Sequence, residues 1–527
     1  MKKLPVIILL AGLMCFSCQD FLEEAPKDEL TADLDFKEKG HAFNAVNSLY
    51  RNGTPQLFDG SVYAGSEAMI GQYMSGLFDN EYKGQEIHVQ HTQQLTLNGN
   101  NLSTYLGGIW DDLYRGISRA NNAIKYIPAT PGLTDQEVKR LAAEARFFRA
   151  LGYYYLVRLF GGVPVITEPY EALDKLSVTR GSVKDVYTLI ETDLKYAVND
   201  GGLADISMAT NGNRITRGAA ATLLAEVYLT MSGFPLQENR YADAAAMARL
   251  VIASGVYSLT PHDRDAAGEV VPENSAYNKL RRVDASATEY VFFHEYAAGI
   301  AASAYPQFTY PVAKPQGVAY TLTNGAYQPK PEFLWGYDAA NDLRRQEKQY
   351  FHTTYNRNGE SRTFPPTPYM WHDDAALFGN ASSGKDLLVY GYADVLLIAA
   401  EAIARAQGVT PEAVNYLTQV RSRAYWKTDP VIISTQLLAL PVNEFVEEVW
   451  EERYRELVFE FQTWYDIVRT RKYPGTSAAA NGEITFVDVV GQTNTWGKTF
   501  AARNLLLPIS EAERQRNPSL GEQNPGY

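Results

Sequence analysis

Apolar side chains recur every three or four positions between residues 134 and 160, as they do along the buried face of an amphipathic helix. Thr134 and Glu137 have the spacing of a capping box at the start of this segment, and two glycines follow Phe160. The pattern therefore predicts a long helix from Thr134 to Phe160.

Two other parts of the chain have the pattern of helical hairpins. An Ala-Glu pair at 225–226 is followed by Gly233, and a second pair at 400–401 is followed by Gly408 at the same spacing. A third pair, at 143–144, nearly repeats this arrangement. The period is irregular, so the sequence suggests stacked helix-turn-helix units without a strict repeat. The amphipathic segments that follow the two glycines span residues 240–254 and 410–423.

A further helix is predicted between residues 443 and 472. Five glutamates lie in its first ten residues, and Arg469, Arg471 and Lys472 lie at its end. This gradient of charge is the one that a helix dipole favours. We therefore interpret the glutamates as the capped, solvated start of a helix and not as an acidic site.

Residues 53–105 and 256–385 break the helical pattern. Both stretches are rich in Gly, Asn, Pro, Ser and Tyr and lack sustained periodicity, although a short strand is predicted from residue 289 to 294. Irregular segments of this length in a compact protein usually carry function or are disordered. Their aromatic content favours function, so we expect ligand-binding loops on a helical scaffold.

The composition limits the class of protein. The chain has 527 residues with 46% hydrophobic content, which is enough for a large core, and its formal net charge is −13. This charge argues against a nucleic-acid-binding protein, because neutralising phosphates requires a basic face. The 35 Tyr residues outnumber the 22 Phe residues, and rings with a polar edge favour half-wet surfaces over dry cores.

The N-terminus has the pattern of an export signal. Lys2 and Lys3 precede an apolar run over residues 4–14, which is too short to span a bilayer. Ser17 before Cys18 resembles a bacterial lipobox, so Cys18 is the predicted lipidated residue; a plain secretory signal is the alternative. The expected division is a lipoprotein signal peptide over residues 1–17, a lipidated N-terminus and tether over 18–40, and a single body over 41–527.

Motifs for nucleotides and metals are weak. Residues 379–385 imitate a phosphate-binding loop, but Asp386 occupies the position where a Ser or Thr would reach Mg²⁺. His294 lacks the second histidine of a zinc protease motif, and His88 and His91 are interpreted as surface side chains. We therefore predict no cofactor and no metal site.

Adjacent acidic pairs leave one catalytic alternative open. A glycoside hydrolase needs two carboxylates on either side of a cleft. Neighbouring residues on a helix do not face one another, so no such pair is by itself a catalytic dyad. Spatial pairing stays open, and a glycoside hydrolase is therefore kept as an alternative to a non-catalytic protein. The pairs are Asp111-Asp112, Asp373-Asp374 and Glu451-Glu452.

Several ordered blocks of the chain resemble the SusD/RagB family of Bacteroidetes surface lipoproteins. The most characteristic block begins at Ala142 and continues to Pro164. Two places depart from the family pattern: Gly391 stands where an Arg usually precedes the Tyr-Ala-Asp block, and Gln462-Thr463 replaces a Gly/Arg-type pair. Both lie in helical scaffold blocks, so they bear on local salt bridges. The matching blocks lie at residues 18–22, 142–164, 216–220, 392–397, 452–469 and 507–527.

The resemblance implies a mainly α fold in which four tetratricopeptide-like helical hairpins form one side, with long irregular loops and a few short strands. It implies that the loops bind a ligand, usually a glycan and in some relatives a peptide, without cofactor or catalysis. The implied partner is a SusC-like TonB-dependent transporter, over which the lipid-anchored protein lies at the outer membrane, facing the cell exterior. Glycan capture and handover is the leading hypothesis, and peptide capture by a RagB-like lipoprotein of the same fold is the second.

Residues of the irregular stretches are the candidates for ligand contact. Aromatic faces stack on the apolar faces of sugar rings, while Asp, Asn and Arg side chains hydrogen-bond the hydroxyls. The alternative for each ring is packing onto the scaffold, and for Arg344 it is the anchoring of a loop. The predicted ligand-binding residues are Phe78, Asp79, Asn80, Tyr82, Tyr296, Tyr305, Tyr310, Arg344, Tyr369, Trp371 and His372.

Overall fold

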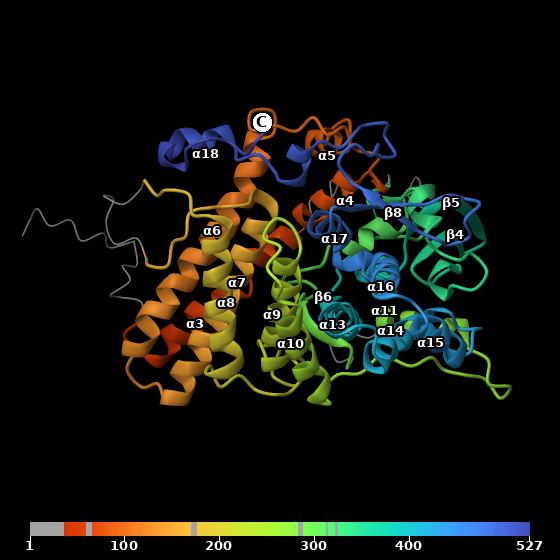
Figure 1. Cartoon of the computed structure of the whole chain (residues 1–527), viewed down its shortest axis with the longest axis horizontal. Helices are drawn as coiled ribbons and strands as arrows, with labels where there is room; N and C mark the ends of the chain where they lie inside the picture. Colours follow the sequence, from red (N-terminus) through yellow and green to blue (C-terminus); the bar gives the residue numbers. More distant parts are fainter. Residues whose placement is uncertain (1–35, 60–65, 170–176, 283–287, 312–314, 322–324) are drawn as a thin grey trace, which may run out of the picture.

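The computed structural model of the chain describes residues 36–59, 66–169, 177–282, 288–311, 315–321 and 325–527. The predicted signal peptide, Cys18 and the tether up to residue 35 lie outside the described residues. The described chain is mostly helical with a few short strands (Figure 1). The predicted mainly α fold is therefore confirmed.

Long helices pack side by side (Figure 1), and together with the shorter α15, α17 and α18 they make up what we call the helical half. Each helix from α6 to α10 contacts the next in sequence, and α10 contacts α13, which also packs on α14 and α16. The two predicted hairpins are confirmed as α9–α10 and α13–α14. The helical half consists of α3 (Lys39–Leu49), α6 (Ser103–Tyr126), α7 (Asp135–Phe160), α8 (Val183–Asn199), α9 (Arg217–Ser232), α10 (Tyr241–Ala253), α13 (Tyr392–Gln407), α14 (Pro411–Ala424), α15 (Pro430–Leu438), α16 (Val442–Glu456), α17 (Thr463–Thr470) and α18 (Glu511–Arg516).

Helix α7 begins and ends where its sequence predicts. Glu137 N donates a hydrogen bond to Thr134 Oγ1 at 3.3 Å, and Thr134 N donates one to Glu137 Oε2 at 3.0 Å, which confirms the capping box. Gly161 follows the helix with a φ of 76°, a backbone region that suits glycine. From Leu141 onward nearly every side chain is buried, so α7 lies at the centre of the helical half.

The Ala-Glu pairs of the weak repeat each place one acid in the core. Glu144 lies 2.8 Å from Arg214. Glu401 lies 2.7 Å from Arg469, and Glu226 lies 3.5 Å from a third arginine. All three glutamates are buried, and a buried charge is tolerated only when it is paired. The repeat signal therefore marks ion pairs that connect each hairpin to another segment.

The segment predicted as one helix over residues 443–472 is divided in two. Helix α16 ends at Glu456, a 3₁₀ turn follows, and α17 begins at Thr463. Phe461 has a φ of 58°, and its ring lies 6.1 Å from that of Trp371 in the loops. The left-handed backbone at Phe461 ends the helical path between α16 and α17, and its ring packs against the loop half.

The acidic start of α16 is solvated in its first turns. Glu444 and Glu447 are exposed as predicted, whereas Glu452 and Glu456 are buried. The solvated-face interpretation is therefore wrong for the end of this helix, because its acids face arginines inside the protein.

The described parts of residues 53–102 and 256–391 form what we call the loop half. A further hairpin after α17 pairs β7 (Lys472–Gly475) with β8 (Thr485–Asp488). Strand β2 (Tyr290–His294) confirms the predicted strand and pairs with β6 (Leu387–Gly391). A hairpin that was not predicted joins β4 (Phe351–Arg357) to β5 (Glu360–Pro368) through an Asn-Gly turn in which both residues have positive φ. The other elements are η2 (Thr54–Phe58), η3 (Glu67–Met69), α4 (Ile70–Ser75), β1 (Phe78–Asp79), α5 (Ile87–Gln93), η6 (Pro272–Asn274), α11 (Ala276–Arg282), η7 (Tyr305–Thr309), β3 (Gln328–Pro329), α12 (Pro331–Leu334), η8 (Leu343–Arg345) and η9 (Ala376–Asn380).

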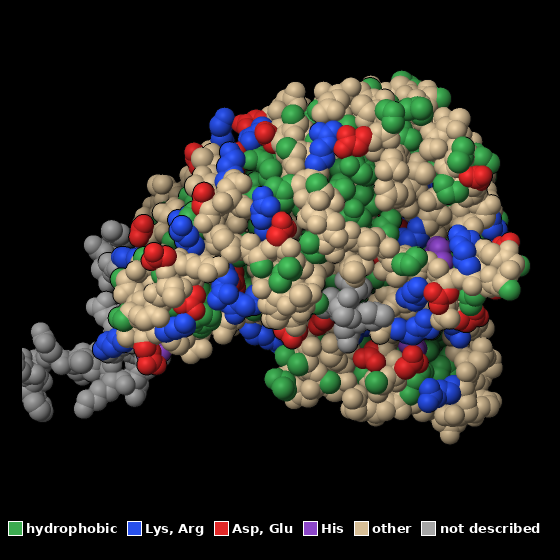
Figure 2. Space-filling model, turned by 90° about the horizontal axis from the view of Figure 1, so that it is seen from below, with side chains coloured by type: hydrophobic (Ala, Val, Ile, Leu, Met, Phe, Trp, Pro, Cys, Tyr) green, Lys and Arg blue, Asp and Glu red, His purple; other side chains and the backbone are tan. Residues whose placement is uncertain are grey.

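One continuous hydrophobic core runs through both halves, and a smaller cluster lies within the loop half. The face in Figure 2 has basic and acidic side chains interspersed. Among the described residues, we find no helix with the length and apolar character needed to cross a bilayer. The buried members of the smaller cluster are Tyr310, Val318, Tyr355, Phe364 and Leu377.

Candidate functional site

The two irregular stretches come together in the loop half. Strand β1 pairs with β3, which places Phe78 opposite Pro329. Tyr296 and Tyr305 each donate a hydrogen bond from their hydroxyl to the carbonyl of Phe58, at 3.3 and 3.0 Å. Residues 238 or more positions apart in the sequence thus form one body.

Trp371 lies at the centre of this body. Its ring centroid is 4.9 Å from that of Tyr305, 5.3 Å from that of Tyr327 and 5.1 Å from that of Phe459. Phe78 stacks on Tyr327 with centroids 4.4 Å apart. Trp371 is 4% exposed, so these rings form a packed aromatic core and not an open platform.

The segment from Phe78 to Tyr82 is held by local hydrogen bonds. Asp79 Oδ1 accepts a hydrogen bond from Lys83 Nζ at 2.9 Å, and Asn80 Oδ1 accepts one from Tyr82 N at 2.8 Å. Asn80 and Tyr82 are buried, whereas Asp79 is half-buried. Of the four predicted contact residues in this segment, Asp79 is therefore the one with a partly exposed polar group.

Tyr310, Tyr369 and His372 belong to a second buried group. Arg281 Nη1 donates to His372 Nδ1 at 3.3 Å, so the imidazole proton is on Nε2, which donates to Tyr310 Oη at 2.9 Å. Burial and the charge of Arg281 hold the pKa of His372 well below its usual value. Tyr369 lies 4.8 Å from the rings of both His352 and His372. His372 is therefore a neutral ring that supports the loops.

The structure places the predicted contact residues in the interior. Asp79 is partly exposed, and the other ten side chains are each at most 8% exposed. The solvent-facing position expected of these rings is wrong, because the rings pack against one another and against the helical half. Direct ligand contact by any of them stays a prediction. The residues are Phe78, Asp79, Asn80, Tyr82, Tyr296, Tyr305, Tyr310, Arg344, Tyr369, Trp371 and His372.

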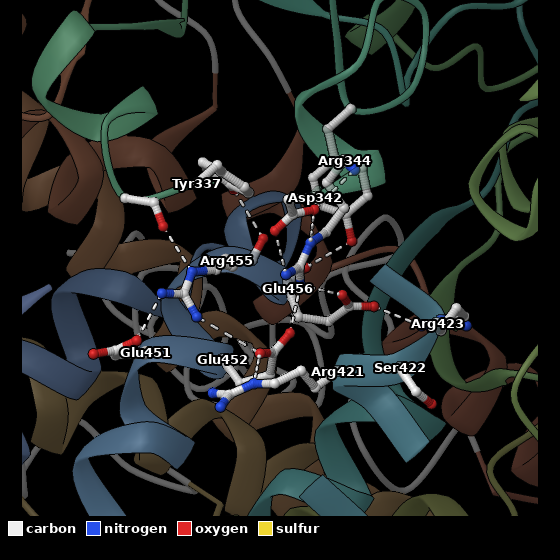
Figure 3. A network of polar contacts seen from close by, with 12 residues as sticks. Tyr337, Asp342, Arg344, Arg421, Ser422, Arg423, Glu451, Glu452, Arg455 and Glu456 are labelled. Carbon is white, nitrogen blue, oxygen red and sulfur yellow. Dashed lines mark hydrogen bonds and ion pairs between the residues drawn. The ribbon is translucent and has the colours of Figure 1, made fainter. Parts of the chain in front are cut away.

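Arg344 connects η8 to α16 and does not face solvent (Figure 3). Its Nη2 lies 2.7 Å from Asp342 Oδ2, and its Nη1 lies 2.8 Å from Glu452 Oε1 and 2.7 Å from Glu456 Oε2. Burial opposes ionisation of Glu452, but Arg344 and Arg421 outweigh it and lower the pKa of that carboxyl to about 2. These contacts support the loop anchor and not the predicted ligand contact.

Tyrosine hydroxyls satisfy the irregular backbone of the loop half. A buried carbonyl outside a helix or sheet ladder still needs a donor, and phenylalanine has none. The half-wet surface role expected of the tyrosines is therefore wrong for those that donate inside the core. Within the loop half, Tyr296 and Tyr305 donate to Phe58 O at 3.3 and 3.0 Å. Other tyrosines of the loop half donate to carbonyls at the end of α16 and in the turn after it: Tyr327 to Val458 O at 2.7 Å, Tyr337 to Arg455 O at 2.9 Å and Tyr350 to Glu456 O at 3.1 Å.

Two other rings of the loop half keep part of their surface open. Ala319 N donates to Leu377 O at 2.6 Å, which places Tyr320 and Phe378 on neighbouring segments. Both rings are half-buried, and the guanidinium carbon of Arg357 lies 3.8 Å from the centroid of Phe378. We call Tyr320, Arg357 and Phe378 the exposed ring patch. It combines part-open ring surface with an exposed guanidinium donor, two features that suit sugar recognition.

The sequence contained a partial signal for this patch. Phe378 lies in η9, a π-helical turn of the kind that is frequent at functional sites, directly before the segment 379–385. The sequence of that segment imitates a phosphate-binding loop. Its lysine is instead engaged within the protein, because Lys385 Nζ donates a hydrogen bond to Arg281 O at 2.5 Å. Tyr320 was missed because no period in an irregular stretch marks which rings face outward.

The acidic pairs considered for a hydrolase have separate partners. Ser383 Oγ donates to Asp373 Oδ2 at 2.6 Å, and Asp374 lies 3.7 Å from Arg281. Glu451 lies 2.6 Å from an arginine one turn along α16. Within the described residues, no group of three or more His, Cys, Asp and Glu side chains is arranged to hold a metal ion.

The fold and its loops define the class of protein: a scaffold of stacked helical hairpins with long loops that converge on one side. Comparison with family models identifies the family. The model described as "Starch-binding associating with outer membrane" matches residues 20–229, and the model described as "SusD family" matches residues 281–527. The chain belongs to the SusD family.

Individual relatives agree with this membership. SusD-like protein P2 of Formosa agariphila is 28% identical and aligns over 100% of both chains. A SusD superfamily protein of Parabacteroides distasonis, 30% identical, superimposes with a TM-score of 0.76 over 95% of this chain and 100% of its own. Surface glycan-binding protein A of Bacteroides thetaiotaomicron, solved in complex with laminarihexaose, is 18% identical and shares the fold, with a TM-score of 0.69 over 92% of this chain and 99% of its own.

Proposed function

We propose that the protein binds a glycan through its loop half at the cell surface and passes it, uncleaved, to a SusC-like TonB-dependent transporter. The observation that carries this proposal is membership in the SusD family, whose matching models cover residues 20–229 and 281–527 and include one described as starch-binding. The laminarihexaose complex of a protein with the same fold supports a glycan over a peptide as the ligand.

The exposed ring patch is the proposed contact surface. Phe378 and Tyr320 offer ring area to the apolar face of a sugar, and Arg357 offers donors to its hydroxyls. The buried rings around Trp371 hold the loops beneath in one arrangement, so little conformational freedom is lost on binding. Each ring contributes ~0.5–1.5 kcal/mol beyond the area it covers, so affinity stays weak enough for release to a transporter.

Calorimetry of the chain without its signal peptide against a panel of soluble polysaccharides, including starch and laminarin, tests this proposal. The Phe378→Ala and Tyr320→Ala substitutions should each weaken binding about threefold or more, and together about tenfold or more. Phe234→Ala is the matched control, because Phe234 is 37% exposed in the helical half and lies under Arg471 with a separation of 5.2 Å. It should bind as the wild type does.

Three results would contradict the proposal or its assignment of the site. Binding of peptides with no binding of any polysaccharide would identify the second hypothesis, peptide capture. Release of reducing sugars that disappears in the Asp373→Asn or Glu451→Gln variant would identify a hydrolase. Affinity unchanged in the Phe378→Ala/Tyr320→Ala double variant would move the glycan site away from the exposed ring patch.

Lipid attachment and partnership with a transporter have their own test. The proposed anchor is Cys18, and the proposed location is the outer leaflet of the outer membrane. Expression of the full chain in a Bacteroidetes host should place the wild type in the outer-membrane fraction with a TonB-dependent barrel that co-purifies with it. Cys18→Ala should release the protein from the membrane, and an unchanged membrane fraction would refute the anchor.

A further inference from the structure

A cavity in the helical half lies outside every segment predicted to bind ligand. It has a volume of about 350 Å³ and is lined by α6, the segment around Pro164 to Glu168, Val178 and the end of α18. This volume is at the lower end of the roughly 300–1,000 Å³ that is typical of small-molecule sites. The cavity is thus large enough for a short ligand and too small for a folded polymer segment.

Two rings form a rigid wall of this cavity. The centroids of Trp110 and Tyr114 are 5.1 Å apart, and Trp110 also packs edge-on against Phe160 at 5.3 Å. Tyr114 Oη donates to the carbonyl of Pro164 at 2.7 Å, which fixes the ring in the cavity wall. Ile117 continues the apolar wall one turn along α6. Both rings are therefore held in place before any ligand arrives.

The polar side of the cavity is acidic. Of its described lining residues, Asp111, Glu168 and Glu513 carry carboxylates and Arg516 carries the one guanidinium. Arg516 Nη1 lies 3.3 Å from Asp111 Oδ1 and 2.9 Å from Glu513 Oε2, so its charge is already shared between two acids. An anionic ligand would face an excess of negative charge here, whereas hydroxyl groups can donate to the carboxylates.

The aromatic wall, the carboxylate acceptors and the small volume of this cavity together favour one class of ligand. We propose that this cavity binds one or two residues of a neutral saccharide and excludes uronic or sulfated sugars. The inference rests on the proposed glycan-binding function, and it adds a second, charge-selective subsite on the scaffold, separate from the exposed ring patch.

The test uses disaccharides that fit the cavity. Maltose, cellobiose and laminaribiose are the neutral probes, and digalacturonic acid is the anionic probe, each titrated by calorimetry or ligand-observed NMR. Ser118→Phe fills the cavity from the half-buried side of α6. Ser434→Phe, at a half-buried helical position on α15, is the matched control. Thermal melting verifies that both variants fold.

At least one neutral disaccharide should bind the wild type and the Ser434→Phe variant and lose tenfold or more in affinity in Ser118→Phe, while digalacturonic acid binds none of them. Glu168→Lys should then admit digalacturonic acid. Any of three results would overturn this inference alone. Disaccharide affinity could be unchanged in Ser118→Phe, or the wild type could bind polysaccharides but no disaccharide. The third such result is equal binding of the neutral and the anionic probes. Absence of binding to every polysaccharide and disaccharide would instead refute the proposed function.

Discussion

The helical half and the loop half bury polar groups in different ways. In the helical half, charges pair across helices: Arg453 lies 3.0 Å from Asp394 and 2.9 Å from Asp466. In the loop half, neutral rings also take this role, as in the contact of His352 Nε2 with the carbonyl of Thr309 at 2.6 Å. The buried charges of the loop half, such as Arg344 and Glu289, pair with helices of the other half. The first arrangement depends on charge and the second on uncharged donors.

The difference follows from the backbone. Helices satisfy their own amides, so long side chains of the helical half are free to pair with one another. Irregular segments leave carbonyls that need donors, and tyrosine and histidine supply them without a buried charge. The loop half should therefore respond to loss of a hydroxyl or gain of a proton, and the helical half to loss of a charge partner.

Arg344 is where the two arrangements meet, and its removal should have the largest effect. Arg344→Met leaves Asp342, Glu452 and Glu456 buried without their shared cation. Breaking a buried pair in this way costs about 3–5 kcal/mol. Urea denaturation should show this loss in the free energy of unfolding.

Its neighbour in η8 provides the control. Arg345 is half-buried, and Arg345→Met should change the free energy of unfolding by less than about 1 kcal/mol. Equal losses in the two variants would show that the network of Figure 3 does not hold the halves together.

Acid should weaken the loop half before the helical half. Burial lowers the pKa of His352 to about 4, below its ordinary value of 6.5. Its stabilising contribution is therefore fully present above pH 6.5 and is lost as the pH falls toward 4, up to roughly 3 kcal/mol. Glu452, with a pKa of about 2, keeps its contribution until the pH falls below its ordinary value of 4.5. Urea denaturation from pH 7.5 to 4.5 measures the slope.

His352→Gln removes this titration and keeps a donor for Thr309, so the loss of stability between pH 6.5 and 4.5 should become smaller. His91 is half-buried, and its Nδ1 lies within hydrogen-bond distance of Thr96 Oγ1, at 2.9 Å, in a contact open to solvent. His91→Gln should leave the slope unchanged. If the pH dependence of stability is identical in wild type and His352→Gln, this histidine does not cause the sensitivity to acid.

The comparison also explains what the sequence could predict. The sequence predicted periodic segments such as α7 together with their caps, because apolar residues recur along one buried face of the helix. The β4–β5 hairpin was not predicted although Asn358-Gly359 is a strong turn signal, because the prolines within β5 argue against a strand. The break at Phe461 could not be predicted, because it depends on rings from distant loops.

The same limit applied to the candidate site. The composition of the two irregular stretches indicated loops, but neither the packing of these stretches on one another nor the exposure of each ring followed from it. Trp371 is buried by Tyr305, Tyr327 and Phe459, which lie far from it in sequence or in separate elements. Phe378, seven residues further, keeps an open face. This difference in exposure comes from tertiary packing, which leaves no pattern in the local sequence.

A single hydroxyl tests the role of tyrosine in the loop half. Tyr327→Phe leaves the buried carbonyl of Val458 without the donor now at 2.7 Å, which costs about 1–3 kcal/mol. Tyr416→Phe is the control, because that hydroxyl bonds Glu412 at 3.0 Å on a half-exposed surface of α14 and should cost about 0.5 kcal/mol or less. Equal losses of stability in the two variants would show that the loop half uses tyrosine for its aromatic ring and not for its hydroxyl donor.

The smallest expected effect belongs to the helical half, at the start of α7. Thr134→Ala removes the oxygen that accepts from Glu137 N and should cost about 1 kcal/mol of unfolding free energy. Thr134→Ser keeps that oxygen and should lower the free energy of unfolding by only about a few tenths of a kcal/mol. The capping box is exposed, and because the core of α7 beyond Leu141 is unchanged, thermal unfolding should stay cooperative in both variants. A loss as large as that of Arg344→Met would mean that α7 depends on its cap more than on its buried face, which is the reverse of the ranking derived from the two halves.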